Sequence, residues 1–141
     1  MTAKEYLLQA RTAQRQADRI RRQIEDLRAV LDGVRGIDYS RDKVLSGADP
    51  AARRDALLDR IVKLEVRWLS EQNSALDRLE DVKAVISAVQ NPAYRELLEL
   101  RYLQGIKLER VADVMGYSFD HVRHMHGWAL LDVKTILELK T

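Results

Sequence analysis

The chain has 141 residues, of which 46% are apolar and 33% are charged, and its 24 basic and 22 acidic side chains nearly cancel. Six glycines and two prolines are too few for the turns of a β-rich fold, and the lack of cysteine excludes disulfides, thiolate metal sites and cysteine nucleophiles. Neither a signal-peptide core nor a run of about 18 apolar residues occurs, so we expect a cytoplasmic protein without membrane contact.

The first predicted element is a long helix with a heptad stripe. Its apolar residues recur at alternating spacings of three and four, which keeps them on one side of a helix and packs that side against a partner helix. The stripe consists of Ala10, Ala13, Ala17, Ile20, Ile24, Leu27, Leu31 and Val34. Thr2 and Glu5 are spaced as in a capping box, and Gly33 and Gly36 are expected to end the helix.

A second long helix is predicted to follow the connection at residues 33–50. It begins at Asp49 and Pro50, a typical N-cap with proline in the first turn, and ends before Pro92. Its stripe comprises Leu57, Ile61, Leu64, Trp68, Gln72, Ala75, Leu79, Val82, Ile86 and Val89, and a second set (Leu58, Val62, Val66, Leu69 and Leu76) widens the apolar face. Because one partner helix covers only a narrow seam, this width predicts a helical bundle, or a homodimer or higher oligomer.

Three shorter helices are predicted after this point. The first spans residues 92–104 and is closed by Gly105, the second spans residues 107–115 and is closed by Gly116, and the third runs from Ser118 towards Glu138. We therefore predict an all-α fold. Residues 1–90 form a long antiparallel, coiled-coil-like hairpin for oligomerisation or partner contact, and residues 91–141 form a small helical bundle with a local core of its own.

The last two predicted helices have the layout of a helix-turn-helix. In the second of them, Val122, Met125, Ala129, Val133 and Ile136 are expected to face the core. In such a unit the second helix lies in the major groove and its first turns reach base edges. The side chains expected to contact DNA are Ser118, Phe119, Asp120, His121, Arg123 and His124.

Residues 99–134 resemble a known family. The segment ELRYLQGIKLERVADVMGYSFDHVRHMHGWALLDVK is similar to region four of bacterial sigma factors and, more closely, to small phage-encoded ArpU-like and RinA-like late transcription regulators. The matching residues are Arg101-Tyr102, Val111-Ala112, Met115-Gly116-Tyr117-Ser118, Val122 and His126-Gly127-Trp128-Ala129-Leu130. The resemblance implies binding of double-stranded DNA and transcriptional control of phage genes, without enzymatic activity.

The sequence departs from the sigma-factor pattern in the charge of the recognition helix. Phe119 and His121 stand where basic residues are usual, and Arg123 is the remaining permanent cation. Because Lys and Arg supply most phosphate affinity, a monomer should bind DNA weakly. Dimerisation, or docking on RNA polymerase or a sigma factor, would compensate.

Two alternatives to a transcription regulator remain open from the sequence. One is a small terminase-like subunit that recognises packaging DNA, and the other is a protein–protein module that docks on RNA polymerase or a sigma factor. Enzymatic function is not expected, since no phosphate loop, HExxH motif or strained serine turn occurs. No cofactor is expected either.

Several single residues are given structural interpretations. His121, His124 and Asp120 are spaced as metal ligands can be, but they are too few, and no metal site is assigned. The interpretations are as follows: core anchors at Trp68 and Trp128, a partly buried structural histidine at His126, close helix packing at Gly127, and at Gln72 either a register-fixing contact or exposure to water. The arginines between residues 11 and 22 are interpreted as a solvated helix face rather than a nucleic-acid surface.

Overall fold

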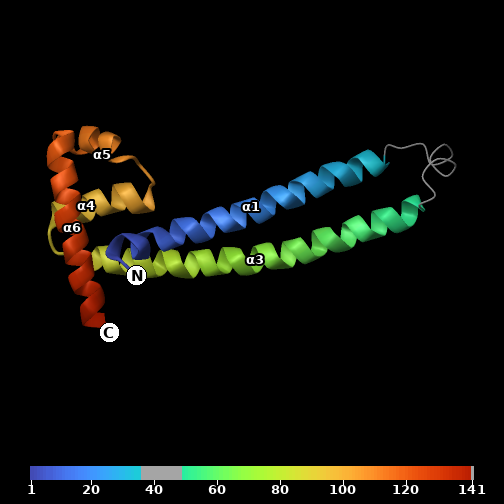
Figure 1. Ribbon diagram of the computed structural model, residues 1–141, viewed down its shortest axis with the longest axis horizontal. Helices are drawn as coiled ribbons and strands as arrows, with labels where there is room; N and C mark the ends of the chain where they lie inside the picture. The colour runs from blue at the N-terminus through green and yellow to red at the C-terminus, as the bar shows by residue number, and fades with distance from the viewer. Residues whose placement is uncertain (36–48, 141) are drawn as a thin grey trace. The chain divides into compact units, whose positions relative to one another are not determined.

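The computed structural model describes residues 1–35 and 49–140 (Figure 1). Every regular element in these two ranges is helical, which confirms the predicted all-α fold. The elements are α1 (Ala3–Arg35), α3 (Pro50–Ala88), α4 (Pro92–Leu98), the π-helix η1 (Glu99–Leu103), α5 (Leu108–Met115) and α6 (Phe119–Lys140). None of the described helices combines the length and apolar character that crossing a bilayer would require.

The chain divides into two compact units. Unit 1 comprises Met1–Ala13 and Ala75–Thr141, and unit 2 comprises Gln14–Ser74. These limits differ from the sequence boundary between residues 90 and 91. The physical reason is that the first turns of α1 and the last turns of α3 share one hydrophobic core with the C-terminal helices.

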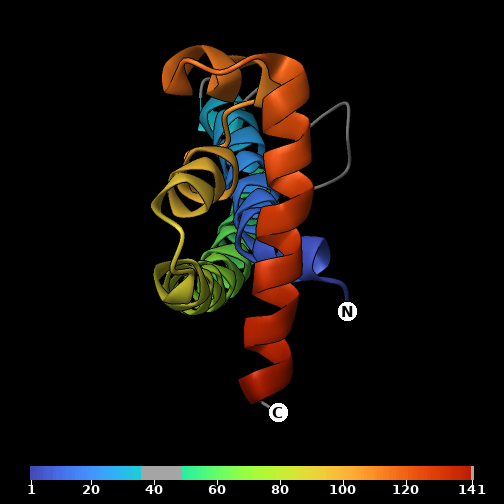
Figure 2. The ribbon, with the colours of Figure 1, turned by 90° about the vertical axis from the view of Figure 1, so that its left-hand side faces the viewer.

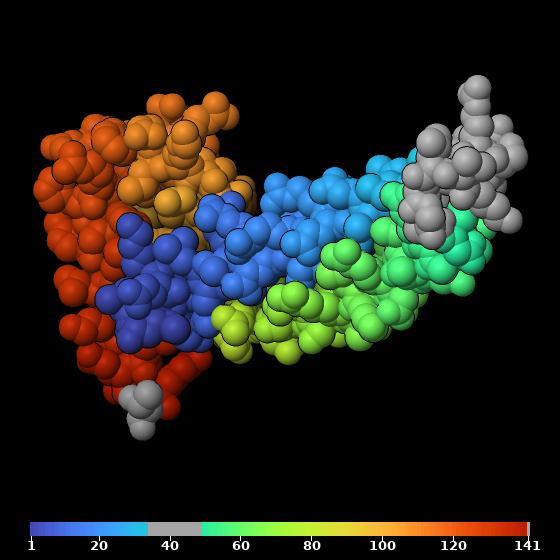
Figure 3. Space-filling view, turned by 45° about the vertical axis from the view of Figure 1, so that its right-hand side comes forward, coloured from blue at the N-terminus to red at the C-terminus, as the bar shows by residue number. Residues whose placement is uncertain are grey.

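Unit 2 is an antiparallel hairpin of α1 and α3, which lie side by side in Figures 1 and 3. Its core holds the predicted heptad residues of both helices: Ile20, Ile24, Leu31 and Ile61 are buried, and Leu27, Leu57, Leu64 and Trp68 pack against them. Gln72 exchanges two side-chain hydrogen bonds with Gln14, of 3.1 and 3.4 Å. This pair fixes the register of α1 against α3, so Gln72 has a partner within its own chain.

The helix starts follow the sequence signals closely. The Thr2 backbone N–H donates to Glu5 Oε2 and the Glu5 N–H donates to Thr2 Oγ1, both at 3.1 Å, which confirms the capping box. Asp49 Oδ1 accepts from the backbone N–H of Ala51, and Asn91 Oδ1 accepts from the first N–H groups of α4. The side-chain oxygens of these caps accept hydrogen bonds from backbone N–H groups that have no partner within the helix.

Of the two glycines expected to end the first helix, Gly33 does not end it. Helix α1 continues through Gly33 to Arg35, and Gly36 lies outside the described residues. A methyl group built at Gly33 would meet no atom within 4 Å. Glycine at such an exposed position costs a helix only about 1 kcal/mol relative to alanine, which the packing of α1 against α3 outweighs.

Unit 1 contains the larger core, in which α6 packs against α4 and α5. Figure 2 shows α5 running crosswise to α6 at the N-terminal end of that helix. The buried residues come from all six helical elements or directly follow one: Leu7, Ala10, Val82, Val85, Ile86, Val89, Leu97, Leu98, Leu100, Tyr102, Val111, Ala112, Val122, Met125, Ala129 and Val133. This core fixes the face that α6 presents to solvent.

The predicted helix over residues 92–104 is present, with one difference. After Leu98 the backbone widens into the π-helix η1, where the Gln104 N–H donates to the Glu99 carbonyl at 3.0 Å. Gly105 then takes a φ of +74°, and the Arg11 guanidinium occupies the place where a Cβ would stand. Glycine is therefore favoured at this turn by its backbone angle, and any larger residue would also have to displace the end of the Arg11 side chain.

Candidate nucleic-acid interface

The turn between α5 and α6 depends on Gly116. Its φ of +76° is left-handed, and its N–H donates to the Ala112 carbonyl at 2.9 Å. The Tyr117 N–H donates to the same carbonyl at 3.1 Å. Glycine suits such a C-terminal cap because a Cβ would be strained there. The chain then enters α6 after Ser118, whose Oγ accepts from the His121 N–H at 3.2 Å.

Helix α6 buries the stripe expected from the sequence. Val122, Ala129 and Val133 are fully buried and Met125 is nearly so, while Ile136 packs against the same core from its edge. Small Ala112 of α5 is also buried. A short helix and a longer one that are joined by three residues and share a buried side have the geometry of a helix-turn-helix.

All six predicted contact residues are exposed at the start of α6. Ser118 is committed to capping the helix through its hydroxyl. The Arg123 guanidinium carbon lies 5.8 Å from the centre of the Phe119 ring, and its Nη1 lies 3.7 Å from Asp120 Oδ1. The ring and the carboxylate thus hold the guanidinium close to the helix surface while its other N–H groups stay available.

His124 presents one ring nitrogen to solvent. Its Nδ1 lies 2.8 Å from the backbone carbonyl of Asp120. Since a carbonyl oxygen can only accept, Nδ1 carries a proton and donates it. In the neutral ring, Nε2 is then left as an acceptor, which suits an amino group on a base edge or a donor on a protein partner.

Sequence reasoning missed part of the exposed surface. Trp128 was expected in the core, but it is 47% exposed and lies 6.2 Å from the His124 ring between centroids. Tyr117 stands edge-on to His121 at 5.0 Å, and Leu131 is 60% exposed. Helical spacing could have predicted the exposure of Trp128. This residue falls between the buried positions of the stripe, and it lies two helical turns after His121, on the same exposed face.

The expected close packing at Gly127 is also wrong. A Cβ at this position would meet no atom within 4 Å, and the residue is exposed. The glycine instead leaves a gap in the outer surface of α6, beside Trp128 and Leu131. Glycine in an exposed helix costs about 1 kcal/mol relative to alanine, and it lets another molecule approach the backbone closely.

The charges on this surface balance. Residues 107–124 carry three basic and three acidic side chains. Among the residues that the structure describes, no group of three or more histidines or carboxylates could hold a metal ion. The surface is therefore neutral, and the exposed side chains at the start of α6 comprise one aromatic ring, two histidines, one carboxylate and one arginine.

Behind this surface, Tyr102 and His126 support α6. Tyr102 is buried, and its hydroxyl shares a hydrogen bond of 2.7 Å with His126 Nε2. Burial lowers the pKa of His126, and the positive charges of Lys4 and Arg101 lower it further. Burial also raises the pKa of Tyr102, so both groups are held neutral. The interpretation of His126 as a partly buried structural residue is confirmed.

This pair predicts a loss of stability in mild acid. Because the pKa of His126 is lower in the folded chain, the unfolded chain binds the proton more tightly. The free energy of unfolding should be highest above about pH 6.5, the ordinary histidine pKa, and should fall as the pH drops below it. Urea titrations across this range test the effect. His126→Gln should flatten the slope, and an unchanged slope would contradict the assignment.

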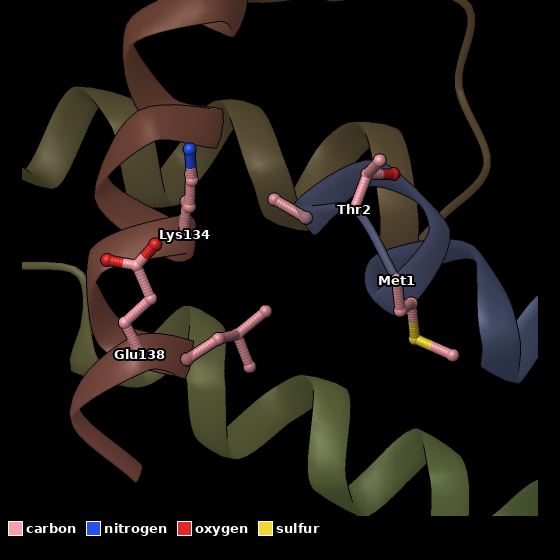
Figure 4. A pocket seen from close by; sticks show the side chains of 6 residues that line it. Met1, Thr2, Lys134 and Glu138 are labelled. Atoms are coloured by element: carbon pink, nitrogen blue, oxygen red, sulfur yellow. The ribbon is translucent and has the colours of Figure 1, made fainter. Parts of the chain in front are cut away.

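A separate cavity lies between the chain start and the end of α6 (Figure 4). It encloses about 450 Å³ and is lined by Met1, Thr2, Ala3, Lys134, Leu137 and Glu138. Its charged groups are one ammonium and one carboxylate, and the remaining lining is aliphatic apart from one hydroxyl. The residues at the start of α6 are not among those that line it.

Comparison of the chain with protein-family models, with curated proteins and with solved structures finds no match.

Proposed function

We propose that this chain is a DNA-binding transcriptional regulator that places α6 in the major groove of double-stranded DNA. The observation that carries the proposal is the turn at Gly116, which joins α5 to α6 and leaves the outward face of the first two turns of α6 exposed. The resemblance of residues 99–134 to phage-encoded regulators supports the same function.

The exposed side chains suit base reading better than phosphate binding. Arginine donates two hydrogen bonds to guanine, and an aromatic side chain such as Phe119 can contact a thymine methyl group. Arg123 lies beside Phe119, so we expect a G·C pair next to a thymine in the preferred site. With balanced charges on residues 107–124, non-specific affinity should be low and should depend weakly on salt.

The test is selection from a randomised double-stranded oligonucleotide library, followed by fluorescence anisotropy on the enriched sequence. Arg123→Ala should weaken specific binding roughly 5- to 150-fold and relax the preference at one base pair. Arg54→Ala is the matched control, since it removes an exposed arginine from α3. No enrichment, or equal loss in both variants, would contradict the proposal.

Docking on RNA polymerase or a sigma factor is a second candidate. The neutral charge and the exposure of Trp128 and Leu131 favour it, because aromatic side chains are enriched at protein interfaces whereas phosphate binding needs cations. Under this candidate, the chain binds purified polymerase holoenzyme and Trp128→Ala abolishes that binding. The library selection then returns no sequence.

A further inference from the structure

One face of α3 in unit 2 is left uncovered by the residues that the structure describes. The side chains of Leu58, Val62, Val66 and Leu69 are 36%, 56%, 65% and 55% exposed. They lie on a different side of the helix from the buried hairpin residue Ile61. The hairpin needs only one apolar stripe on α3, so this second stripe, which we call the α3 seam, is not required to hold α1.

The register of the α3 seam identifies its occupant. Its residues from Val62 onwards follow heptad spacing, with Val66 and Asn73 at a positions and Val62 and Leu69 at d positions. A β-branched residue at a with leucine at d favours two parallel strands, and a single asparagine at an a position specifies that state. We propose that the α3 seam binds the α3 seam of a second copy of this chain, with the two helices parallel and in register.

Asn73 decides between the two directions of pairing. In a parallel dimer Asn73 faces Asn73 of the second copy. The side-chain NH2 group of one asparagine can then donate a hydrogen bond to the side-chain oxygen of the other. In an antiparallel dimer a and d positions face each other, so Asn73 would meet Val62 or Leu69 of the second copy. A polar group buried without a partner costs stability, which favours the parallel arrangement.

The charges beside the α3 seam are compatible with self-association. Lys63 is paired with Asp59 at 2.9 Å, and Glu65 is paired with Arg28 of α1. In parallel pairing, Lys63 of one copy lies next to Leu58 of the other, and Glu65 lies next to Ser70. Between Val62 and Asn73 no like charges therefore meet across the dimer. Asp59, at the a position before Val62, would face Asp59 of the second copy, so the apolar contact begins at Val62.

The extent of the α3 seam sets the expected strength. Sixteen residues from Leu58 to Asn73 span about 24 Å of helix, which is smaller than a standard interface of about 800 Å² per partner. Since α3 is already held helical by α1, association pays no cost for helix formation. We expect a reversible, concentration-dependent dimer, and this proposal stands whether or not α6 binds DNA.

Sedimentation equilibrium of the full chain without DNA tests the association. The protein concentration should run from about 5 to about 500 μM, because a small interface is expected to give a weak dimer. The mass should rise from 16.3 kDa towards twice that value. Val66→Glu should abolish the rise, while Val30→Glu, at a 48% exposed valine of α1, should preserve it. Circular dichroism confirms that both variants are folded. A strict monomer, or a dimer that survives Val66→Glu, would overturn the proposal.

The direction of pairing has its own test, because the chain has no cysteine. Asn73→Cys should form an interchain disulfide under mild oxidation, since facing a positions of a parallel dimer bring two Cβ atoms within disulfide reach. Val30→Cys is the control and should remain a monomer on a non-reducing gel. A dimer in which Asn73→Cys does not crosslink would overturn the parallel, in-register arrangement.

Discussion

A fragment that starts at residue 91 is expected to be unfolded in solution. Six of the sixteen buried residues in the unit 1 core lie before Asn91, on the first turns of α1 and the last turns of α3. Residues 91–141 alone are about the size at which a core becomes marginal. The sequence had suggested that they could form a core of their own, but Leu97 and Val122 share their core with Leu7 and Val82.

Circular dichroism of the fragment tests this expectation. A fragment of residues 75–141 is the comparison, since it restores Val82, Val85, Ile86 and Val89 and should recover part of the helical signal. Addition of a peptide of residues 1–13 should raise its melting temperature further. A cooperative thermal transition in the fragment of residues 91–141 would show that the sequence boundary marks a self-sufficient domain.

The second large effect is expected for Leu97→Ala. Leu97 is fully buried in unit 1, so its truncation removes apolar contacts and leaves a cavity. Such substitutions lower the free energy of unfolding by about 2–5 kcal/mol. Leu131→Ala is the matched control, because Leu131 is 60% exposed on α6, and surface changes usually stay within about 0.5 kcal/mol. Urea denaturation measures the free energy of unfolding of both variants. Similar decreases in the two variants would contradict the packing described for α6.

The elements of this fold could be predicted from local signals. Heptad spacing located α1 and α3, and the caps at Thr2 and Asp49 marked helix starts to within a residue or two. Gly105 and Gly116 both take positive φ angles where helices were expected to end. Each of these signals acts over a few residues, which is the range that single-sequence patterns cover.

The candidate site was only partly predictable. The stripe of Val122, Met125 and Ala129 places Arg123 and His124 outwards, and the structure agrees. Trp128 and Gly127 were assigned by residue type, a large aromatic to the core and a helical glycine to close packing. Their position on the helix determines their exposure instead: both fall outside the buried stripe, and both are exposed. The shared core of unit 1 depends on contacts between distant segments, which periodicity does not report.

The composition of the unit 1 core has a consequence for how the chain is made. Leu7 and Ala10 leave the ribosome early, but their partners at Val122 and Val133 are synthesised near the end. The unit 2 core needs nothing beyond Trp68, so the hairpin can close while synthesis continues, as N-terminal parts generally fold first. We therefore expect a chain released after Asn91 to carry a folded hairpin, while Leu7 and Ala10 lack the part of their core that α4, η1, α5 and α6 supply.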